Sequence, residues 1–321
     1  MKTHNKRKPK VILIGGTYRA YITFQNLIKR KDVNYCQFIC MKGLDANENK
    51  YLLKIKVICK KNKIPFSSSN KINKKLANII KNHKADFMLG IGIWRSIVQD
   101  NILNYLKIGY LAVHGSPLPK YRGWAPINWQ IINGEKNVIL RAFKLNTHID
   151  AGPLLLDNKH KYLEAKINIE NDKHLDEILV EYDKKHIELN NKIIDLVLTK
   201  KLIFKDQNNN LATYTCNRNN NDSLINWNDN SVDVFNFIRA QNIPSIGAYT
   251  FYNKKKIYIW KVKIKKEYKN YIGRIPGKVI KTDFKSVIIL TKDSAIEVLE
   301  ASHKKLKKLN NIFHSVRLCC K

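Results

Sequence analysis

The sequence predicts an α/β protein in which a doubly wound parallel sheet is followed by a smaller, mainly β, barrel-like domain. Through the first half of the chain, short apolar runs alternate with longer amphipathic stretches, which is the pattern of repeated βα units. Later the pattern changes to alternating β-branched and aromatic residues with hairpin-like breaks. Because 321 residues exceed one ordinary domain, we expect two domains, 1–207 and 208–321.

The first domain is expected to open with a buried strand that leads through Gly15 and Gly16 into a helix ending near residue 30. The pattern then repeats along the chain. Further strands are predicted at 34–41, 64–66, 85–93 and 109–115, and helices at 48–63 and 73–84. In a parallel sheet of this kind, ligands bind outside the carboxyl ends of the strands.

A further apolar segment at 137–146 and a turn at 148–153 come next, and an amphipathic helix at 171–200 should close the first domain. The segment 205–223 is polar and rich in asparagine, as expected of a linker. Beyond it, one short helix is predicted at 231–242 and strands within 247–264 and 277–301. This second part reads as a small barrel-like domain.

The chain is strongly basic, with 59 Lys and Arg against 26 Asp and Glu and a formal net charge of +33. Most of the excess is lysine spread among asparagine and isoleucine, without an arginine-rich stripe, so we interpret it as a compositional bias. The resulting positive field favours phosphate-bearing substrates, including nucleotide sugars and tRNA.

Six cysteines show neither CxxC spacing nor a paired framework, which is typical of reduced thiols and predicts no metal site. The basic start of the chain leads into an apolar run too short for a signal peptide or a membrane span. We therefore expect a soluble, cytoplasmic protein that has no membrane partner.

The stretch GYLAVHGSPLPKYRGWAPINW, residues 109–129, places a histidine between a buried strand and a stiff loop. His114 ends the predicted strand, and Pro117 and Pro119 follow within the loop. A histidine held at the edge of a parallel sheet lies where ligands usually bind.

Several blocks in this order resemble the folate-dependent formyltransferases, which include methionyl-tRNA formyltransferase and the enzymes that formylate amino-sugar nucleotides. The segment 114–135 is similar to the family's His-x-Ser-Leu-Leu-Pro-x-x-Arg-Gly core, and 147–155 to its Asp-Thr-Gly segment. The segment 223–261 resembles the start of the family's C-terminal domain. The resemblance covers nearly the whole chain and implies a Rossmann-like catalytic domain.

Formyl transfer from a folate nitrogen to an amine passes through a tetrahedral intermediate, which requires a base and a donor for the developing oxyanion. The resemblance implies that His114 is the base and that Asp150 orients it. A non-catalytic interpretation exists for each residue. His114 could be an ordinary buried histidine, and Asp150 could cap the turn before Gly152. His148, close to Asp150, is expected to be a plain surface residue.

The resemblance also implies 10-formyltetrahydrofolate as co-substrate and assigns binding residues, although glycines in a strand often mark only a bulge. The residues expected to hold the folate are Leu89, Gly90, Ile91, Gly92, Ile93 and Trp94. Those expected to bind the acceptor are Ser116, Pro117, Leu118, Arg122 and Asn128.

One position departs from the family pattern, because Ala112 stands where the family has an asparagine whose amide holds the formyl oxygen. Loss of one oxyanion donor costs roughly a hundred- to a thousandfold in turnover. Asn128, backbone amides of the loop after His114, or water are the candidate substitutes.

The acceptor is predicted from smaller features. The tRNA enzymes carry a basic, glycine-rich insertion after the second strand, whereas this chain has a short, mixed segment at 41–51. Segments 90–98, 124–129 and 218–227 resemble the amino-sugar formyltransferases. The sequence thus favours a nucleotide-linked amino sugar, with initiator tRNA as the alternative. A third reading is a catalytically impaired homologue that binds folate or RNA.

Overall fold

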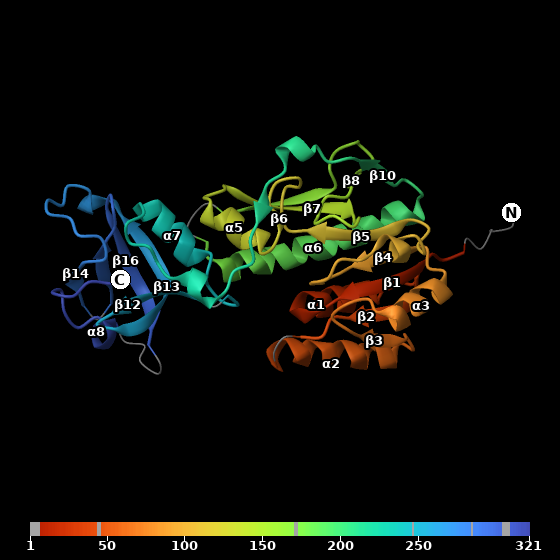
Figure 1. Cartoon of the computed structure of the whole chain (residues 1–321), viewed down its shortest axis with the longest axis horizontal. Helices are drawn as coiled ribbons and strands as arrows, with labels where there is room; N and C mark the ends of the chain where they lie inside the picture. The colour runs from red at the N-terminus through yellow and green to blue at the C-terminus, as the bar shows by residue number, and fades with distance from the viewer. Residues whose placement is uncertain (1–6, 44–45, 170–172, 246, 284, 304–308) are drawn as a thin grey trace. The chain divides into compact units, whose positions relative to one another are not determined.

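The computed structural model describes residues 7–43, 46–169, 173–245, 247–283, 285–303 and 309–321 (Figure 1). The chain forms two compact units. The first unit comprises 1–123, 139–166 and 182–214, and the second comprises 124–138, 167–181 and 215–321. Each unit is described by itself.

The βα order predicted for the first half of the chain is present. Its elements are β1 (Lys10–Gly15), α1 (Thr17–Leu27), β2 (Asn34–Cys40), α2 (Ala46–Lys61), β3 (Phe66–Ser68), α3 (Lys74–His83), β4 (Phe87–Gly90), α4 (Asp100–Leu103) and β5 (Gly109–His114). Asn73 caps α3 by accepting from the Leu76 amide at 3.0 Å, a common way to satisfy the first turn of a helix.

The elements that follow in the chain are β6 (Arg122–Gly123), α5 (Pro126–Ile132), β7 (Asn137–Lys144), β8 (Leu154–Leu156), β9 (Glu164–Asn168), α6 (Leu175–Leu198), β10 (Ile203–Lys205) and β11 (Tyr214–Thr215). The predicted helix at 171–200 corresponds to α6, and its expected start at 171–172 lies outside the described residues. Pro126 opens α5, where the missing N–H has no intrahelical acceptor to lose.

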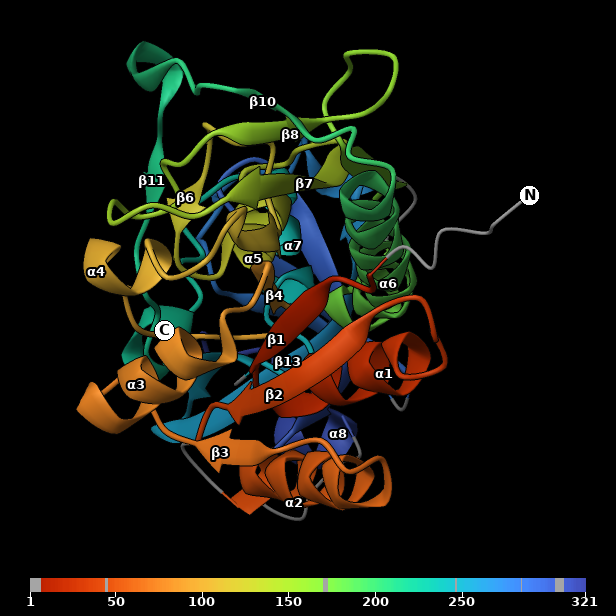
Figure 2. The same cartoon turned by 90° about the vertical axis from the view of Figure 1, so that its right-hand side faces the viewer.

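Within the described residues, the central sheet has nine strands, of which eight follow the order β10-β8-β7-β5-β4-β1-β2-β3 while β9 pairs with β7. The pairs of β3, β2, β1, β4 and β5 are all parallel, which confirms the doubly wound core. The sheet then continues through β7, which runs antiparallel to β5. Figure 2 shows α3 and α4 on one face of this core and α1 and α6 on the other.

The strand predicted at 85–93 is shorter than expected, because β4 ends at Gly90. A Cβ on Gly92 would lie 2.7 Å from the Cβ of Ala20 and from the carbonyl oxygen of Gly16. The absence of a side chain at Gly92 therefore lets the chain leave the sheet close against α1.

The remaining elements are α7 (Ser231–Arg239), β12 (Ala248–Tyr252), β13 (Lys255–Lys265), β14 (Val279–Thr282), β15 (Val287–Leu290), β16 (Ala295–Ser302) and α8 (Leu309–Ile312), with single 3-10 turns at Asn209–Leu211, Asn220–Ser223 and Lys266–Tyr268. The strands form an antiparallel sheet in the order β12-β13-β16-β15-β14.

The C-terminal residues join the two edges of this sheet. Cys320 pairs through its backbone with Tyr252, at the end of β12, in an isolated antiparallel β-bridge. Cys319 forms a second β-bridge of this kind with Lys278, just before β14. The sheet is therefore curled, and the barrel-like character expected from the sequence is confirmed. Pairing of the edges also covers strand edges that would otherwise be open.

Candidate active site

His114 and Asp150 come together at the carboxyl end of β5. The Nδ1 atom of His114 lies 3.6 Å from Oδ2 of Asp150, and the two side chains are 12% and 21% exposed. The distance is longer than a hydrogen bond, but a small movement of either side chain closes it. Both side chains are therefore partly buried and keep some exposure to solvent.

The other ring nitrogen of His114 also faces an acceptor. Its Nε2 atom lies 3.1 Å from the carbonyl oxygen of Tyr121. A carbonyl oxygen only accepts, so it pairs with the ring when Nε2 carries the proton. The ring is therefore held between Tyr121 on one side and Asp150 on the other.

Asp150 is fixed by the backbone as well as by its side chain. It lies in the left-handed region, with φ of 47°, a conformation that aspartate tolerates better than most residues. Its Oδ2 atom accepts the Gly123 N–H at 2.8 Å. The same oxygen faces His114, so Asp150 links the loop after β7 to β6 and to the histidine, beyond any local capping of its own turn.

The loop after His114 is anchored at several points. The Ser116 hydroxyl is buried and donates to the Lys120 carbonyl at 2.7 Å. The Leu118 side chain packs with Phe143 and Leu154, and its carbonyl accepts from the Arg141 guanidinium. Pro117 is half-buried between these anchored residues. The loop backbone is thus held in one conformation beside the histidine.

Arg122, predicted to bind the acceptor, is only 1% exposed. Its guanidinium donates to Gln207 at 2.8 Å, to Asn209 at 2.8 Å and to the Tyr214 hydroxyl at 3.2 Å. These contacts tie the segment that includes Asn209 to β6. In this structure the Arg122 guanidinium holds two parts of the chain together next to the loop that follows His114.

The residues predicted to hold folate lie at the end of β4, the strand adjacent to β5, and in the segment that follows it. Leu89, Gly90 and Ile91 are buried, whereas Ile93 is 38% exposed and Trp94 is half-buried. The Trp94 Nε1 atom is buried, and no hydrogen-bond partner for it occurs in the described part of the chain. A buried donor without a partner suits a ligand that carries acceptors, as the nitrogen and oxygen atoms of a pterin do.

Asn128 lies on α5, in the second compact unit. Its amide nitrogen donates to the Ala240 carbonyl at 2.7 Å and to the Ser245 hydroxyl at 3.1 Å. Both amide protons are therefore engaged within that unit.

Two contributors to the site were not predicted from the sequence. Tyr121 supplies the carbonyl that faces His114, and Arg141 holds the loop carbonyl of Leu118. No hydropathy signal marks a backbone carbonyl. A buried arginine in an otherwise apolar strand, as at 141, is the signal that could have been used, because such a charge needs partners.

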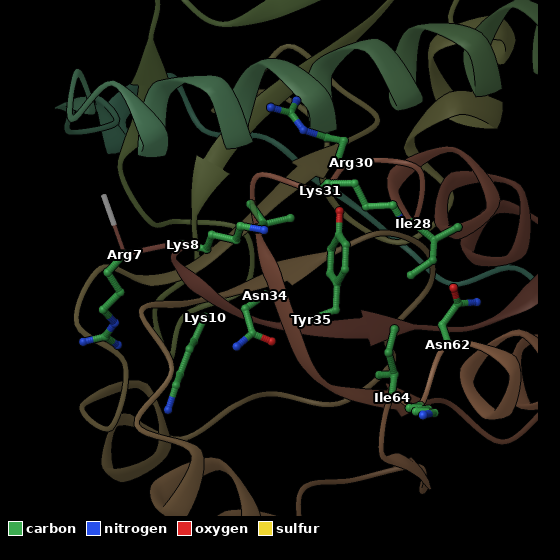
Figure 3. A pocket seen from close by; sticks show the side chains of 12 residues that line it. Arg7, Lys8, Lys10, Ile28, Arg30, Lys31, Asn34, Tyr35, Asn62 and Ile64 are labelled. Atoms are coloured by element: carbon green, nitrogen blue, oxygen red, sulfur yellow. The ribbon is translucent and has the colours of Figure 1, made fainter. Parts of the chain in front are cut away.

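A basic pocket of about 550 Å³ lies elsewhere in the first unit. Arg7, Lys8 and Lys10 line it together with residues at the start of β2, including Asn34 and Tyr35 (Figure 3). These are the amino ends of β1 and β2, whereas His114 is at a carboxyl end. The pocket is therefore at the opposite edge of the parallel sheet and contains none of the predicted site residues.

A histidine and a carboxylate lie close together beside an anchored loop, at the carboxyl end of a strand of a parallel sheet. This is where ligands usually bind in proteins of the α/β class. The formyl transferase family model matches residues 25–177, and the model of the formyl transferase C-terminal domain matches 218–316. The chain belongs to the formyltransferase family.

Similar proteins include the bifunctional polymyxin resistance protein ArnA of Wigglesworthia glossinidia brevipalpis, 31% identical over 94% of this chain and 44% of that protein. The chain therefore spans less than half of that relative. The methionyl-tRNA formyltransferase of Mesoplasma florum is 30% identical over 95% of this chain and 97% of that one.

Among solved structures, the N-formyltransferase from Helicobacter canadensis in complex with folinic acid and dTDP-3-aminofucose has the same fold. Its TM-score is 0.61 at 19% identity, with 91% of this chain and 99% of that one covered. In the described ranges of this chain, no helix combines the length and apolar character needed to cross a bilayer.

Proposed function

We propose that this protein transfers a formyl group from 10-formyltetrahydrofolate to the amine of a nucleotide-linked amino sugar. The observation that carries the proposal is the His114–Asp150 pair, with 3.6 Å between Nδ1 and Oδ2, at the start of the loop that matches the family. The Helicobacter canadensis enzyme, which was solved with a folate and an amino-sugar nucleotide, supports this acceptor class.

In this mechanism His114 and Asp150 handle one proton. As the acceptor amine attacks the formyl carbon, its nitrogen becomes acidic. His114 takes the proton on Nε2, which then points away from the Tyr121 carbonyl, while Nδ1–H stays on Asp150. The Asp150 carboxylate holds the ring and stabilises its charged form, as the acid of a catalytic triad does. The Gly123 N–H keeps that carboxylate in place, so a loss of this contact should disturb the pair.

The folate is proposed to lie against Leu89–Trp94, with the Trp94 indole N–H donating to a pterin acceptor. The rigid loop of Ser116, Pro117 and Leu118 is proposed to border the acceptor. Arg122 would hold β6, which follows this loop in the chain, through its contacts with Gln207 and Asn209. We assign this chemistry to a catalytic domain at 1–207, and the remaining residues, 208–321, to a C-terminal domain of the formyltransferase type.

Methionyl-tRNA formylation is the second candidate, and a surface of the curled sheet favours it. On β13 the half-buried rings of Tyr258 and Trp260 stack at 5.9 Å. The Lys256 ammonium lies 5.2 Å from the centre of the Tyr258 ring. Aromatic rings interleaved with a cation are typical of surfaces that bind single-stranded nucleic acid.

A competition assay separates the two acceptors. The purified chain is supplied with 10-formyltetrahydrofolate and with either a panel of amino-sugar nucleotides or methionyl initiator tRNA, and kcat/KM is compared. We expect a higher value for one amino-sugar nucleotide than for the tRNA. A higher value for the tRNA would select the second candidate, and binding of folate without transfer to any acceptor would select the impaired homologue.

A further inference from the structure

Every second residue of β5 lies on the same face of the strand, and the last residue in this row belongs to the candidate active site. Tyr110, Ala112 and His114 point to the same side, because successive side chains of a strand point to opposite sides. Tyr110 is 2% exposed and packs in the core cluster beneath α3 and α4. The histidine at the end of this row is the proposed base.

The Tyr110 ring leans along the strand toward His114. The register pairs Met88 with Tyr110 and Gly90 with Ala112. A Cβ built on Gly90 would nevertheless lie 3.0 Å from the Tyr110 hydroxyl, and 3.0 Å from the Cβ of Ala112. The hydroxyl therefore lies at the level of Ala112. Ala112 precedes His114 by two residues, which along a strand is about 7 Å.

The small residues at 90 and 112 make this position possible. Any side chain on Gly90 would meet the Tyr110 hydroxyl, and a longer side chain on Ala112 would extend from the same place. The hydroxyl thus occupies space beside the methyl group of Ala112, on the face that carries His114.

The Tyr110 hydroxyl is available as a donor. No hydrogen bond of this hydroxyl occurs among the residues that the structure describes, whereas the buried hydroxyls of Tyr35 and Tyr252 donate to carbonyls at 2.6 Å. Burial raises the pKa of Tyr110, and the negative charge of Asp150 raises it further. The hydroxyl therefore keeps its proton at neutral pH and belongs to the electrostatic surroundings of Asp150.

We propose that the Tyr110 hydroxyl is a catalytic group that donates a hydrogen bond to the formyl oxygen. The proposal rests on the proposed formyl transfer. It assigns to a tyrosine the donor that the developing oxyanion requires, at a site where position 112 carries only a methyl group.

The transfer takes place in two stages. The amine nitrogen forms a bond to the formyl carbon, and the carbonyl π electrons move to the oxygen, which the Tyr110 hydroxyl stabilises. His114 accepts the proton that the attacking nitrogen loses. The oxygen electrons then restore the carbonyl, the bond between the formyl carbon and folate N10 breaks, and His114 returns the proton to N10. The products are a formamide and tetrahydrofolate.

The test compares Tyr110→Phe with the wild type, and Tyr105→Phe is the matched control because this half-buried tyrosine packs against the same cluster. The first readout needs no acceptor. It is the infrared carbonyl stretch of bound 10-formyltetrahydrofolate labelled with ¹³C in the formyl group. We expect a lower frequency in the wild type and in Tyr105→Phe than in Tyr110→Phe, because the formyl carbonyl of the folate bound to Tyr110→Phe has lost its hydrogen-bond donor.

The second readout is turnover with an acceptor. Tyr110→Phe should lower kcat by about ten- to a thousandfold with little change in KM. Ala112→Asn should restore turnover in the Tyr110→Phe protein, where the space is free, but not raise it in the wild type. An unchanged carbonyl frequency together with unchanged kcat would overturn the role of Tyr110.

The two readouts separate this inference from the proposed function. The carbonyl frequency could be lower in the wild type than in Tyr110→Phe while the wild type transfers the formyl group to no acceptor. In that case the proposed function fails and the donor role of Tyr110 stands. If the wild type transfers the group and Tyr110→Phe matches it in both readouts, only the inference fails. Should Tyr110→Phe not fold, an unshifted carbonyl band in the folded wild type would still overturn the inference.

Discussion

His114 Nδ1 and Asp150 Oδ2 lie 3.6 Å apart, at the end of β5 and in the loop after β7. The antiparallel register pairs His114 with Arg141 and Leu111 with Lys144, so the loop after β7 has to return toward His114. The close approach also depends on the Gly123 N–H, which holds the carboxylate. The pair is therefore positioned by three separate parts of the first unit.

Replacement of His114 by alanine should abolish formyl transfer and leave folate binding largely intact. The imidazole is proposed to move the proton, whereas folate is proposed to contact Leu89–Trp94. Isothermal titration with 10-formyltetrahydrofolate and a transfer assay separate the two effects. His148→Ala is the control, because His148 is exposed and should transfer normally. Equal losses of binding and turnover in His114→Ala would make His114 a ligand contact instead.

Replacement of Asp150 by asparagine should lower kcat by about a hundredfold or more, because the neutral amide no longer stabilises a charged imidazole. Asparagine tolerates the left-handed backbone at this position, and its side-chain oxygen can still accept from Gly123. The fold should therefore persist, as measured by the thermal midpoint of unfolding. A drop in that midpoint with unchanged kcat would show a purely structural role.

Asn128→Ala should destabilise the protein rather than slow the chemistry. Its amide donates to the Ala240 carbonyl and the Ser245 hydroxyl, and removal leaves these acceptors with fewer partners. The expected loss in free energy of unfolding is about 1–3 kcal/mol, measured by urea denaturation. A large fall in kcat at unchanged stability would instead support Asn128 as the oxyanion donor.

The stability of the protein should depend on pH through His186, which is buried in α6. Its ring contacts the Thr23 hydroxyl at 3.3 Å and the Asn190 side chain. Burial holds the pKa of His186 well below its usual range, and the positive charge of Arg19 lowers it further. The folded protein therefore keeps this ring neutral where the unfolded chain binds a proton.

A lowered pKa of a base means that the stabilising difference is present above the unfolded value and is lost as the pH falls below it. The free energy of unfolding should fall below about pH 6.5, by up to about 1.4 kcal/mol per pH unit. His186→Gln should remove this part of the slope, whereas the exposed His148→Gln should not. Identical acid slopes in the wild type and His186→Gln would contradict the assignment.

The order of βα units could be predicted because each buried strand and each amphipathic helix leaves a local apolar pattern. The antiparallel direction of β7 could not be predicted, since the hydropathy pattern of a strand is the same in either direction. The helix at Pro126 was likewise not placed, although proline at a first helical turn is a known signal.

Within the site, His114 could be located from the end of its strand and the loop that follows. The approach of Asp150 was expected from the resemblance, but its contact with Gly123 depends on the left-handed backbone at Tyr121 and Asp150, which no hydropathy pattern encodes. The place of Tyr110 follows from strand alternation, yet its lean toward Ala112 depends on the missing side chain of Gly90.

Formyl transfer by this chain can be followed through the formyl carbon itself. The purified chain is incubated with 10-formyltetrahydrofolate labelled with ¹³C in the formyl group and with the acceptor panel, and each acceptor is analysed by mass spectrometry. We expect a labelled formamide on one acceptor amine with the wild type and none with His114→Ala. Acceptors that all stay unlabelled while the wild type binds the folate, or equal labelling by His114→Ala, would contradict this expectation.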